Sequence, residues 1–156
     1  RLFAGSLREN LTLGLLDPGD DAVLWASKHT GLYQSVIATH AEGFQQMIYE
    51  GGQGLSGGQR QLVNLTRVFL RNPKIWLLDE PTAAMDSGTE AKVIGAFKKA
   101  LKQQHTLVLV THKADLLQLV DRIIVVANNQ IVMDGEKQHV LDRLQKPQIE
   151  SLGAAL

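Results

Sequence analysis

Apolar and polar positions follow one pattern up to about residue 72 and a different pattern beyond it. The first stretch is predicted to be mainly helical, and Ser6 with Glu9 three positions later matches a capping box. Asn72-Pro73 predicts the end of the longest helix, because the residue before a proline is disfavoured in helical conformation. After the helix that Ser6 caps, the predicted helices cover residues 21–29, 32–38 and 56–71.

Beyond residue 72, short apolar runs alternate with amphipathic stretches. Runs at 75–78 and 106–111 predict buried strands, and the Ser-Gly-Thr-Glu string at 87–90 predicts the capping box of a helix between them. Because strand, helix and strand alternate, the sequence predicts an α/β fold with a mainly parallel sheet. The remaining predicted elements are a helix over 114–120, a hairpin of 123–127 and 130–134, and an amphipathic helix around 140–144.

Composition and charge limit the kind of protein. The chain has 156 residues, of which 44% are hydrophobic and 21% are charged, as in ordinary globular proteins. Lys+Arg and Asp+Glu both number 16, so the net charge is zero, which argues against nucleic acid as the main partner. The chain has no cysteine, hence no disulfide, and no apolar run long enough to span a bilayer. Because it begins with Arg1 rather than Met, we expect a piece of a longer protein.

The most informative string is Leu55-Ser56-Gly57-Gly58-Gln59, at the start of the predicted long helix. At average composition it occurs by chance about once per million positions. The first N–H groups of a helix have no intrahelical partner, and the helix dipole adds partial positive charge. The two glycines let an anion approach closely and Ser56 can add a hydrogen bond, so the string predicts a phosphate-binding site. By shape alone, a capped helix after a flexible turn fits equally well.

Further candidate residues follow the predicted strands. Asp79 and Glu80 end the first strand, and an acid at the carboxyl end of a parallel strand lies beside the ligand crevice. Asp79 is a candidate Mg²⁺ ligand, Glu80 a candidate general base, and His112, at the end of the next strand, a candidate partner of a γ-phosphate. The structural alternatives are a solvated acidic turn, a solvated strand end and, for Asp86, helix capping.

Three glycines also match the spacing of a dinucleotide-binding fingerprint, namely Gly52, Gly54 and Gly57. That fingerprint needs a strand directly before it and an acid after the next strand. The preceding run, 47–49, is short for such a strand, so the match is weak.

Taken together, the motifs resemble the nucleotide-binding domain of ABC transporters over nearly the whole chain. Leu55–Gln59 resembles the ABC signature, and Ile75–Asp79 resembles the Walker B motif with Glu80 as the catalytic glutamate. The segment 83–86 resembles the D-loop, and His112 resembles the switch histidine.

A finer resemblance concerns the subfamily. Leu2–Leu11 is similar to the stretch just after the Q-loop of the family, and together with 75–78 and 107–113 it most resembles type I secretion exporters. These exporters move proteins out of Gram-negative bacteria, which implies a location at the cytoplasmic face of the inner membrane.

The resemblance also implies a mechanism and partners. Two such domains, expected to be a homodimer, sandwich two ATP molecules with Mg²⁺, and the signature of one domain contacts the γ-phosphate held by the Walker A motif of the other. Asp79, Glu80 and His112 then act on the nucleotide of their own subunit, while Asp86 couples the two sites. Closure and hydrolysis drive the transmembrane domain of the same transporter, and no nucleic acid is involved.

One departure from the family is large. Walker A needs Gly-Lys followed by Ser or Thr, and no Gly-Lys pair occurs in the chain. We therefore expect a partial P-loop NTPase fold without the phosphate-loop half, with the helical subdomain in 1–72 and the C-terminal part of the RecA-like core in 73–156. This chain alone is expected not to hydrolyse ATP. Thr66 stands where the family usually has a small residue, so its hydroxyl needs a partner if it is buried.

Two other functional classes remain open. The first is a non-transport ABC ATPase head of the DNA-repair or chromosome-organising type, which usually carries a long coiled coil or a basic surface. The second is a non-hydrolytic interaction module, for which Ser56→Arg would leave the ATPase activity of the parent protein unchanged.

Overall fold

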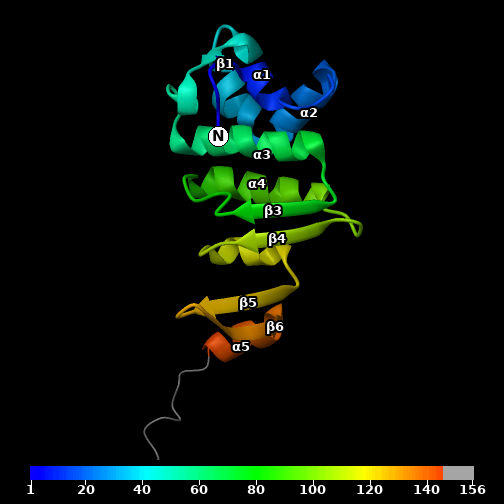
Figure 1. Ribbon diagram of the computed structural model, residues 1–156, viewed down its shortest axis with the longest axis vertical. Helices are drawn as coiled ribbons and strands as arrows, with labels where there is room; N and C mark the ends of the chain where they lie inside the picture. Colours follow the sequence, from blue (N-terminus) through cyan, green and yellow to red (C-terminus); the bar gives the residue numbers. More distant parts are fainter. Residues whose placement is uncertain (146–156) are drawn as a thin grey trace, which may run out of the picture. The chain divides into compact units, whose positions relative to one another are not determined.

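The computed structural model describes residues 1–145, and the chain divides into two compact units, 1–112 and from Lys113 onward. Helices and strands alternate between residues 57 and 110, as the predicted α/β class requires (Figure 1). The first unit contains β1 (Gly5–Ser6), α1 (Leu7–Thr12), α2 (Asp20–Thr30), the π-helical turn Tyr33–Ile37, the 3₁₀ turn Gly43–Gln45, β2 (Met47–Ile48), the 3₁₀ turn Glu50–Gly52, α3 (Gly57–Arg71), β3 (Ile75–Asp79), α4 (Ser87–Ala100) and β4 (Thr106–Val110).

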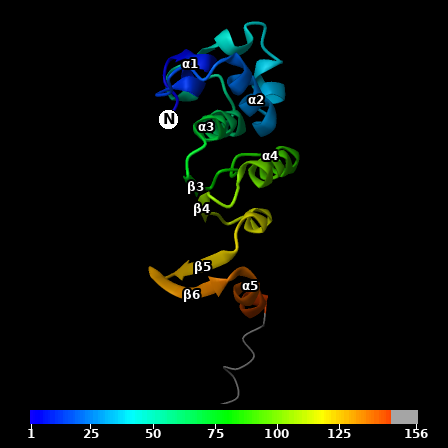
Figure 2. The same ribbon diagram turned by 90° about the vertical axis from the view of Figure 1, so that its right-hand side faces the viewer.

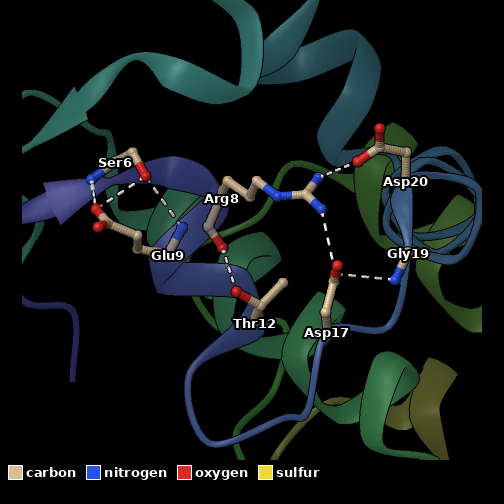
Figure 3. A network of polar contacts seen from close by, with 7 residues as sticks. All are labelled: Ser6, Arg8, Glu9, Thr12, Asp17, Gly19 and Asp20. Atoms are coloured by element: carbon tan, nitrogen blue, oxygen red, sulfur yellow. Dashed lines mark hydrogen bonds and ion pairs between the residues drawn. The ribbon is translucent and has the colours of Figure 1, made fainter.

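The first helix begins with the predicted capping box. The Ser6 Oγ accepts a hydrogen bond from the Glu9 N–H at 3.1 Å, and the Ser6 N–H donates to the Glu9 carboxylate at 2.6 Å (Figure 3). The bond from the Ser6 N–H is the main cause that holds the pKa of Glu9 below its usual value. Arg8 lies within 3.4 Å of Asp17 and 2.5 Å of Asp20, and these ion pairs connect α1 to the start of α2.

Helices α1 and α2 both pack on α3, which is the longest helix of this unit (Figure 2). The predicted helix 21–29 is confirmed as α2 and ends at Gly31 in the left-handed conformation, whereas 32–38 forms a π-helical turn instead of an α-helix. Between α2 and α3, the buried Thr30 and Thr66 hydroxyls are 2.7 Å apart, and Thr66 also donates to the Leu62 carbonyl. The hydroxyl of Thr66 therefore has the partners that its burial requires.

Strands β3 and β4 pair in parallel, with Asp79 opposite Val110. One face of this pair belongs to the core: Trp76 is 1% exposed and contacts Phe69 of α3 and Phe97 of α4 in edge-on arrangements, with ring centroids 5.2 and 5.8 Å away. Such aromatic contacts add to the burial of apolar area. Both helices are thus anchored to the same face of the strand pair.

The prediction of buried strands holds for one face of this strand pair only. Alternate residues point away from the core, and the side chain of Leu77 is 73% exposed. The reason is the two-residue period of a strand, because α3 and α4 cover only the face that carries Trp76. The residues exposed with Leu77 are Ile75, Val108 and Val110.

The start of α4 also differs from the prediction. The cap is Asp86 rather than Ser87, and its carboxylate accepts a hydrogen bond from the Thr89 N–H at 2.9 Å. Glu90, which a capping box would direct back to the cap, instead accepts a hydrogen bond from the Thr82 hydroxyl. Thr82 and Glu90 are both buried, so each needs a polar partner. The bond between them meets this need, whereas a capping box of Ser87 and Glu90 would break it.

The second unit is built on the predicted hairpin. Asn128 and Asn129 both have positive φ, 49° and 60°, as a two-residue turn with this pair requires. The predicted helix at 114–120 is a 3₁₀ helix, while the last helix is confirmed. No helix among residues 1–145 is long and apolar enough to cross a bilayer. The elements are the 3₁₀ helix Ala114–Leu119, β5 (Arg122–Ala127), β6 (Gln130–Glu136) and α5 (Lys137–Gln145).

Candidate functional site

The turn that opens α3 carries the glycine-rich string. Ser56 caps the helix: its Oγ accepts from the Gln59 N–H at 3.2 Å, and its own N–H donates to the Gln59 Oε1 at 2.9 Å. The Gln59 amide also donates to the Ser35 carbonyl, which ties this turn to the π-helical segment. Within the described residues, no acceptor lies on the N–H groups of Gly57 and Gly58, so both can bind an anion.

Close packing gives Gly58 a second role that the sequence did not reveal. A Cβ at this position would lie 2.8 Å from the Ala84 carbonyl oxygen, and a Cβ at Gly57 would lie 3.1 Å from the Ala84 Cβ. The glycines therefore allow the first turn of α3 to touch the loop that follows β3. The predicted signature and the predicted D-loop form one contact.

The predicted acids and the histidine meet at the carboxyl ends of β3 and β4. Asp79 is the last residue of β3, and the Glu80 N–H continues the ladder by donating to the Val110 carbonyl at 2.9 Å. The His112 N–H donates to Glu80 Oε1 at 2.7 Å and Thr111 Oγ1 lies 3.4 Å from Oε2, so both carboxylate oxygens have partners. The His112 ring is 97% exposed, with Nε2 4.0 Å from Glu80 Oε1. The structure thus brings Glu80 and His112 together, and Asp79 precedes Glu80 at the end of β3.

Glu80 has an unusual backbone conformation. Its φ is 42°, in the left-handed region that non-glycine residues seldom adopt. Such a conformation costs on the order of 1–3 kcal/mol and persists only where the surroundings enforce it. The turn reverses the chain directly after β3 and leaves the carboxylate beside His112.

Asp86 binds the first turn of α4. Its carboxylate accepts hydrogen bonds from the Thr89 hydroxyl at 2.7 Å and from the Thr89 N–H at 2.9 Å. These bonds, the one from the hydroxyl first, hold the pKa of Asp86 below its usual value. Its observed contacts are those of a helix cap.

A residue that sequence reasoning missed is Gln61, on the face of α3 that touches the loop. Its amide donates to the Glu80 carbonyl at 3.1 Å and accepts from the Ala84 N–H at 3.0 Å. The sequence offered no signal for this contact beyond the position of Gln61 two residues after the glycine-rich string.

The side chains present suit a nucleotide with a divalent cation. Within residues 1–145, no three His, Asp or Glu side chains gather into a complete metal site. Mg²⁺, however, is commonly held by one or two carboxylates together with phosphate oxygens, and Asp79 can supply one such carboxylate. The dinucleotide alternative does not fit, because the strand before its glycines, β2, has only two residues and pairs antiparallel with β1.

Comparison with known proteins decides the family. The family model for ABC transporters matches residues 6–83, half of the chain. The chain belongs to the ABC transporter family. It is 37% identical over 141 residues to the ABC transporter ATP-binding protein YwjA of Bacillus subtilis, covering 90% of this chain and 24% of YwjA.

Relatives from other organisms have similar identity. The ABC transporter BEA3 of Gibberella fujikuroi is 39% identical over 140 residues, which are 90% of this chain and 11% of BEA3. Multidrug resistance protein 1 of Entamoeba histolytica is 35% identical over 144 residues, again 90% of this chain and 11% of the relative. The chain thus spans about a quarter or less of the length of these relatives.

A solved structure confirms the fold class. A bacterial Atm1-family ABC exporter with ATP bound superposes with a TM-score of 0.83 at 27% identity, over 91% of this chain and 25% of the exporter chain. The α/β fold predicted from the sequence is therefore that of part of an ABC ATPase.

The contact between α3 and the loop after β3 makes Gly58 sensitive to substitution. We expect Gly58→Ala to lower the free energy of unfolding by about 1–3 kcal/mol, because the added Cβ overlaps the Ala84 carbonyl. Gly95→Ala in α4 is the matched control: its Cβ meets nothing within 4 Å, so the better helix propensity of alanine should raise stability by about 0.5–1 kcal/mol. Urea unfolding of the two variants measures the difference, and equal stabilisation by both would contradict the contact.

The stabilisation that the Asp86 cap gives to α4 should depend on pH. Because the pKa of Asp86 is lowered in the folded state, its stabilising bonds are fully present above the pKa of an unfolded aspartate and are lost as the pH falls through the lowered pKa. We expect the carboxyl carbon of Asp86 to titrate below the range of ordinary aspartates in an NMR titration. Thr89→Val, which removes the hydroxyl donor, should move that pKa upward; no movement would show that the hydroxyl bond is not the main cause.

Proposed function

We propose that the chain is the C-terminal part of the ATPase domain of an ABC exporter, and that it couples ATP binding and hydrolysis to transport across a membrane. The observation that carries this proposal is the Glu80 carboxylate, which lies at the end of β3 and is held by the N–H of His112 from the neighbouring strand end. A carboxylate oriented in this way, on the residue that follows Asp79, suits a base that activates water next to a metal-bound triphosphate.

Each motif receives a role in this proposal. The string Leu55–Gln59 binds the γ-phosphate of a nucleotide held by a second such domain, because it offers the N–H groups of Gly57 and Gly58. Asp79 helps to hold Mg²⁺, Glu80 is the general base, and His112 positions the γ-phosphate. Asp86, through the loop that it ends, couples the two nucleotide sites.

The domain division belongs to the same proposal. Residues 1–72 form the helical subdomain, and 73–156 are assigned to the C-terminal part of the RecA-like ATP-binding core, of which 146–156 lie outside the described residues. Support comes from the packing of α1 and α2 on α3, and from the left-handed Asn72, which ends α3 before the first core strand. The transmembrane domain and a second ATPase domain, in a homodimer, are the partners, and the site lies on the cytoplasmic side of the membrane.

The class of transported substrate is the most specific part of the proposal. The resemblance of Leu2–Leu11 and the two strand segments favours a protein cargo, as in type I secretion from the bacterial inner membrane. The relative named multidrug resistance protein 1 supports small molecules as the second candidate class. Transport into inverted vesicles by the protein that contains this chain distinguishes the two cargo classes.

On its own, the 156-residue chain should bind ATP weakly and not hydrolyse it. The physical reason is that a phosphate-binding loop, with its backbone amides and lysine, supplies most phosphate contacts in such ATPases, and the chain has no Gly-Lys pair. Isothermal titration of the chain with Mg·ATP tests this expectation. Micromolar binding would contradict it.

In the protein that contains this chain, Glu80→Gln should reduce ATP turnover by about 10²–10⁴-fold while ATP binding is retained, because the amide cannot accept a proton from water. The measurement is steady-state phosphate release together with the affinity for Mg·ATP. Ser56→Arg should also abolish turnover, since it blocks the turn that receives the second nucleotide. Wild-type turnover in Glu80→Gln would refute the role of the base, and wild-type turnover in Ser56→Arg would favour the non-hydrolytic interaction module.

A further inference from the structure

One side chain connects the helix of the glycine-rich string to the loop that begins at Glu80. The amide of Gln61 donates to the Glu80 carbonyl at 3.1 Å through Nε2 and accepts from the Ala84 N–H at 3.0 Å through Oε1. Gln61 is half-buried and stands three residues after Gly58, so both lie on the face of α3 that meets this loop. The two bonds thus reinforce the contact between Gly58 and Ala84.

The two groups that Gln61 binds flank one tight turn: the Glu80 carbonyl lies at its start, and the Ala84 N–H follows its last residue. The Glu80 carbonyl also accepts from the Ala83 N–H at 3.2 Å, which closes the turn on itself. At its start, Glu80 has the φ of 42° that a non-glycine residue adopts only under constraint. Gln61 supplies part of that constraint from outside the turn, because it fixes the carbonyl at one end and the N–H at the other.

We propose that Gln61 is a positioning residue for ATP hydrolysis, which holds the backbone of Glu80 so that its carboxylate stays beside His112. The proposal rests on the proposed function, in which Glu80 is the base. Because Gln61 belongs to the helix whose first turn receives the nucleotide of the opposite domain, the same side chain makes the position of the base depend on that helix.

The residue type fits this role. A primary amide is both a donor and an acceptor, and the bond to a carbonyl and the bond from an N–H need one of each. Glutamate has the same length but only acceptors when ionised, so it keeps the Ala84 bond and loses the bond to Glu80. Methionine has a similar length and makes neither bond. These two substitutions therefore separate the hold on Glu80 from the hold on the loop.

The experiment compares ATP turnover of the full protein that contains this chain with its variants Gln61→Glu and Gln61→Met. Both should lower kcat by roughly 10–100-fold and leave the KM for ATP within about 2-fold, because a displaced base affects the chemical step and not the binding of substrate. The matched control is Gln103→Met, at an exposed position, which should keep the kcat of the wild type.

The remaining outcomes separate this proposal from simpler explanations. If Gln61→Glu kept the wild-type kcat while Gln61→Met lost it, the bond to Ala84 alone would matter and the positioning of Glu80 would be overturned. A loss of ATP affinity or of the thermal transition in both variants would show a merely structural role and overturn it too. If the wild-type protein hydrolyses ATP and both variants do so equally well, this proposal alone is refuted. If the wild-type protein does not hydrolyse ATP, the proposed function is refuted and this proposal with it.

Discussion

The candidate site depends on the close approach of α3 to the loop after β3. A Cβ at Gly58 would lie only 2.8 Å from the Ala84 carbonyl, so only glycine lets the helix and the loop come this close. Because the same helix begins with the Ser56 cap and the same loop begins at Glu80, this contact fixes the distance between the proposed anion-binding turn and the proposed base. Two segments that are far apart in the sequence, the start of α3 and the loop after β3, are in this way held in contact.

The aromatic core supports the contact between α3 and the loop after β3. Trp76 on β3 contacts Phe69 of α3 and Phe97 of α4, so the strand that ends in the acids is packed against both helices. Aromatic side chains bury large areas, and the edge-on contacts fix their relative orientation. This packing fixes the position of β3, and with it the position of Asp79 and Glu80 at its end, relative to α3 and α4.

Local signals in the sequence predicted those features that depend on neighbouring residues. The capping box of Ser6 and Glu9 involves residues three apart and forms as predicted, and the long helix begins after Ser56 as predicted. Either Asp86 or Ser87 could cap the N-terminus of α4. Asp86 is the cap, and Glu90, the partner that a Ser87 capping box would need, is hydrogen-bonded to Thr82 instead. The exposure of one strand face and the contacts of Gln61 depend on residues distant in sequence, which a pattern of apolar and polar positions does not reveal. The family resemblance pointed to Asp79 and Glu80 but not to Gln61, which binds the backbone of Glu80.

The backbone of Glu80 shows why the site cannot be reduced to its motifs. A residue with a φ of 42° needs external support, and Glu80 receives it from three directions: its N–H binds the Val110 carbonyl, its own carbonyl binds Gln61 and Ala83, and its carboxylate binds the His112 N–H. These partners come from β4, α3 and the loop itself. Because the strain is offset by bonds from separate elements, a shift in any one of them moves the carboxylate. The position of the proposed base is therefore a property of the packing of the whole unit.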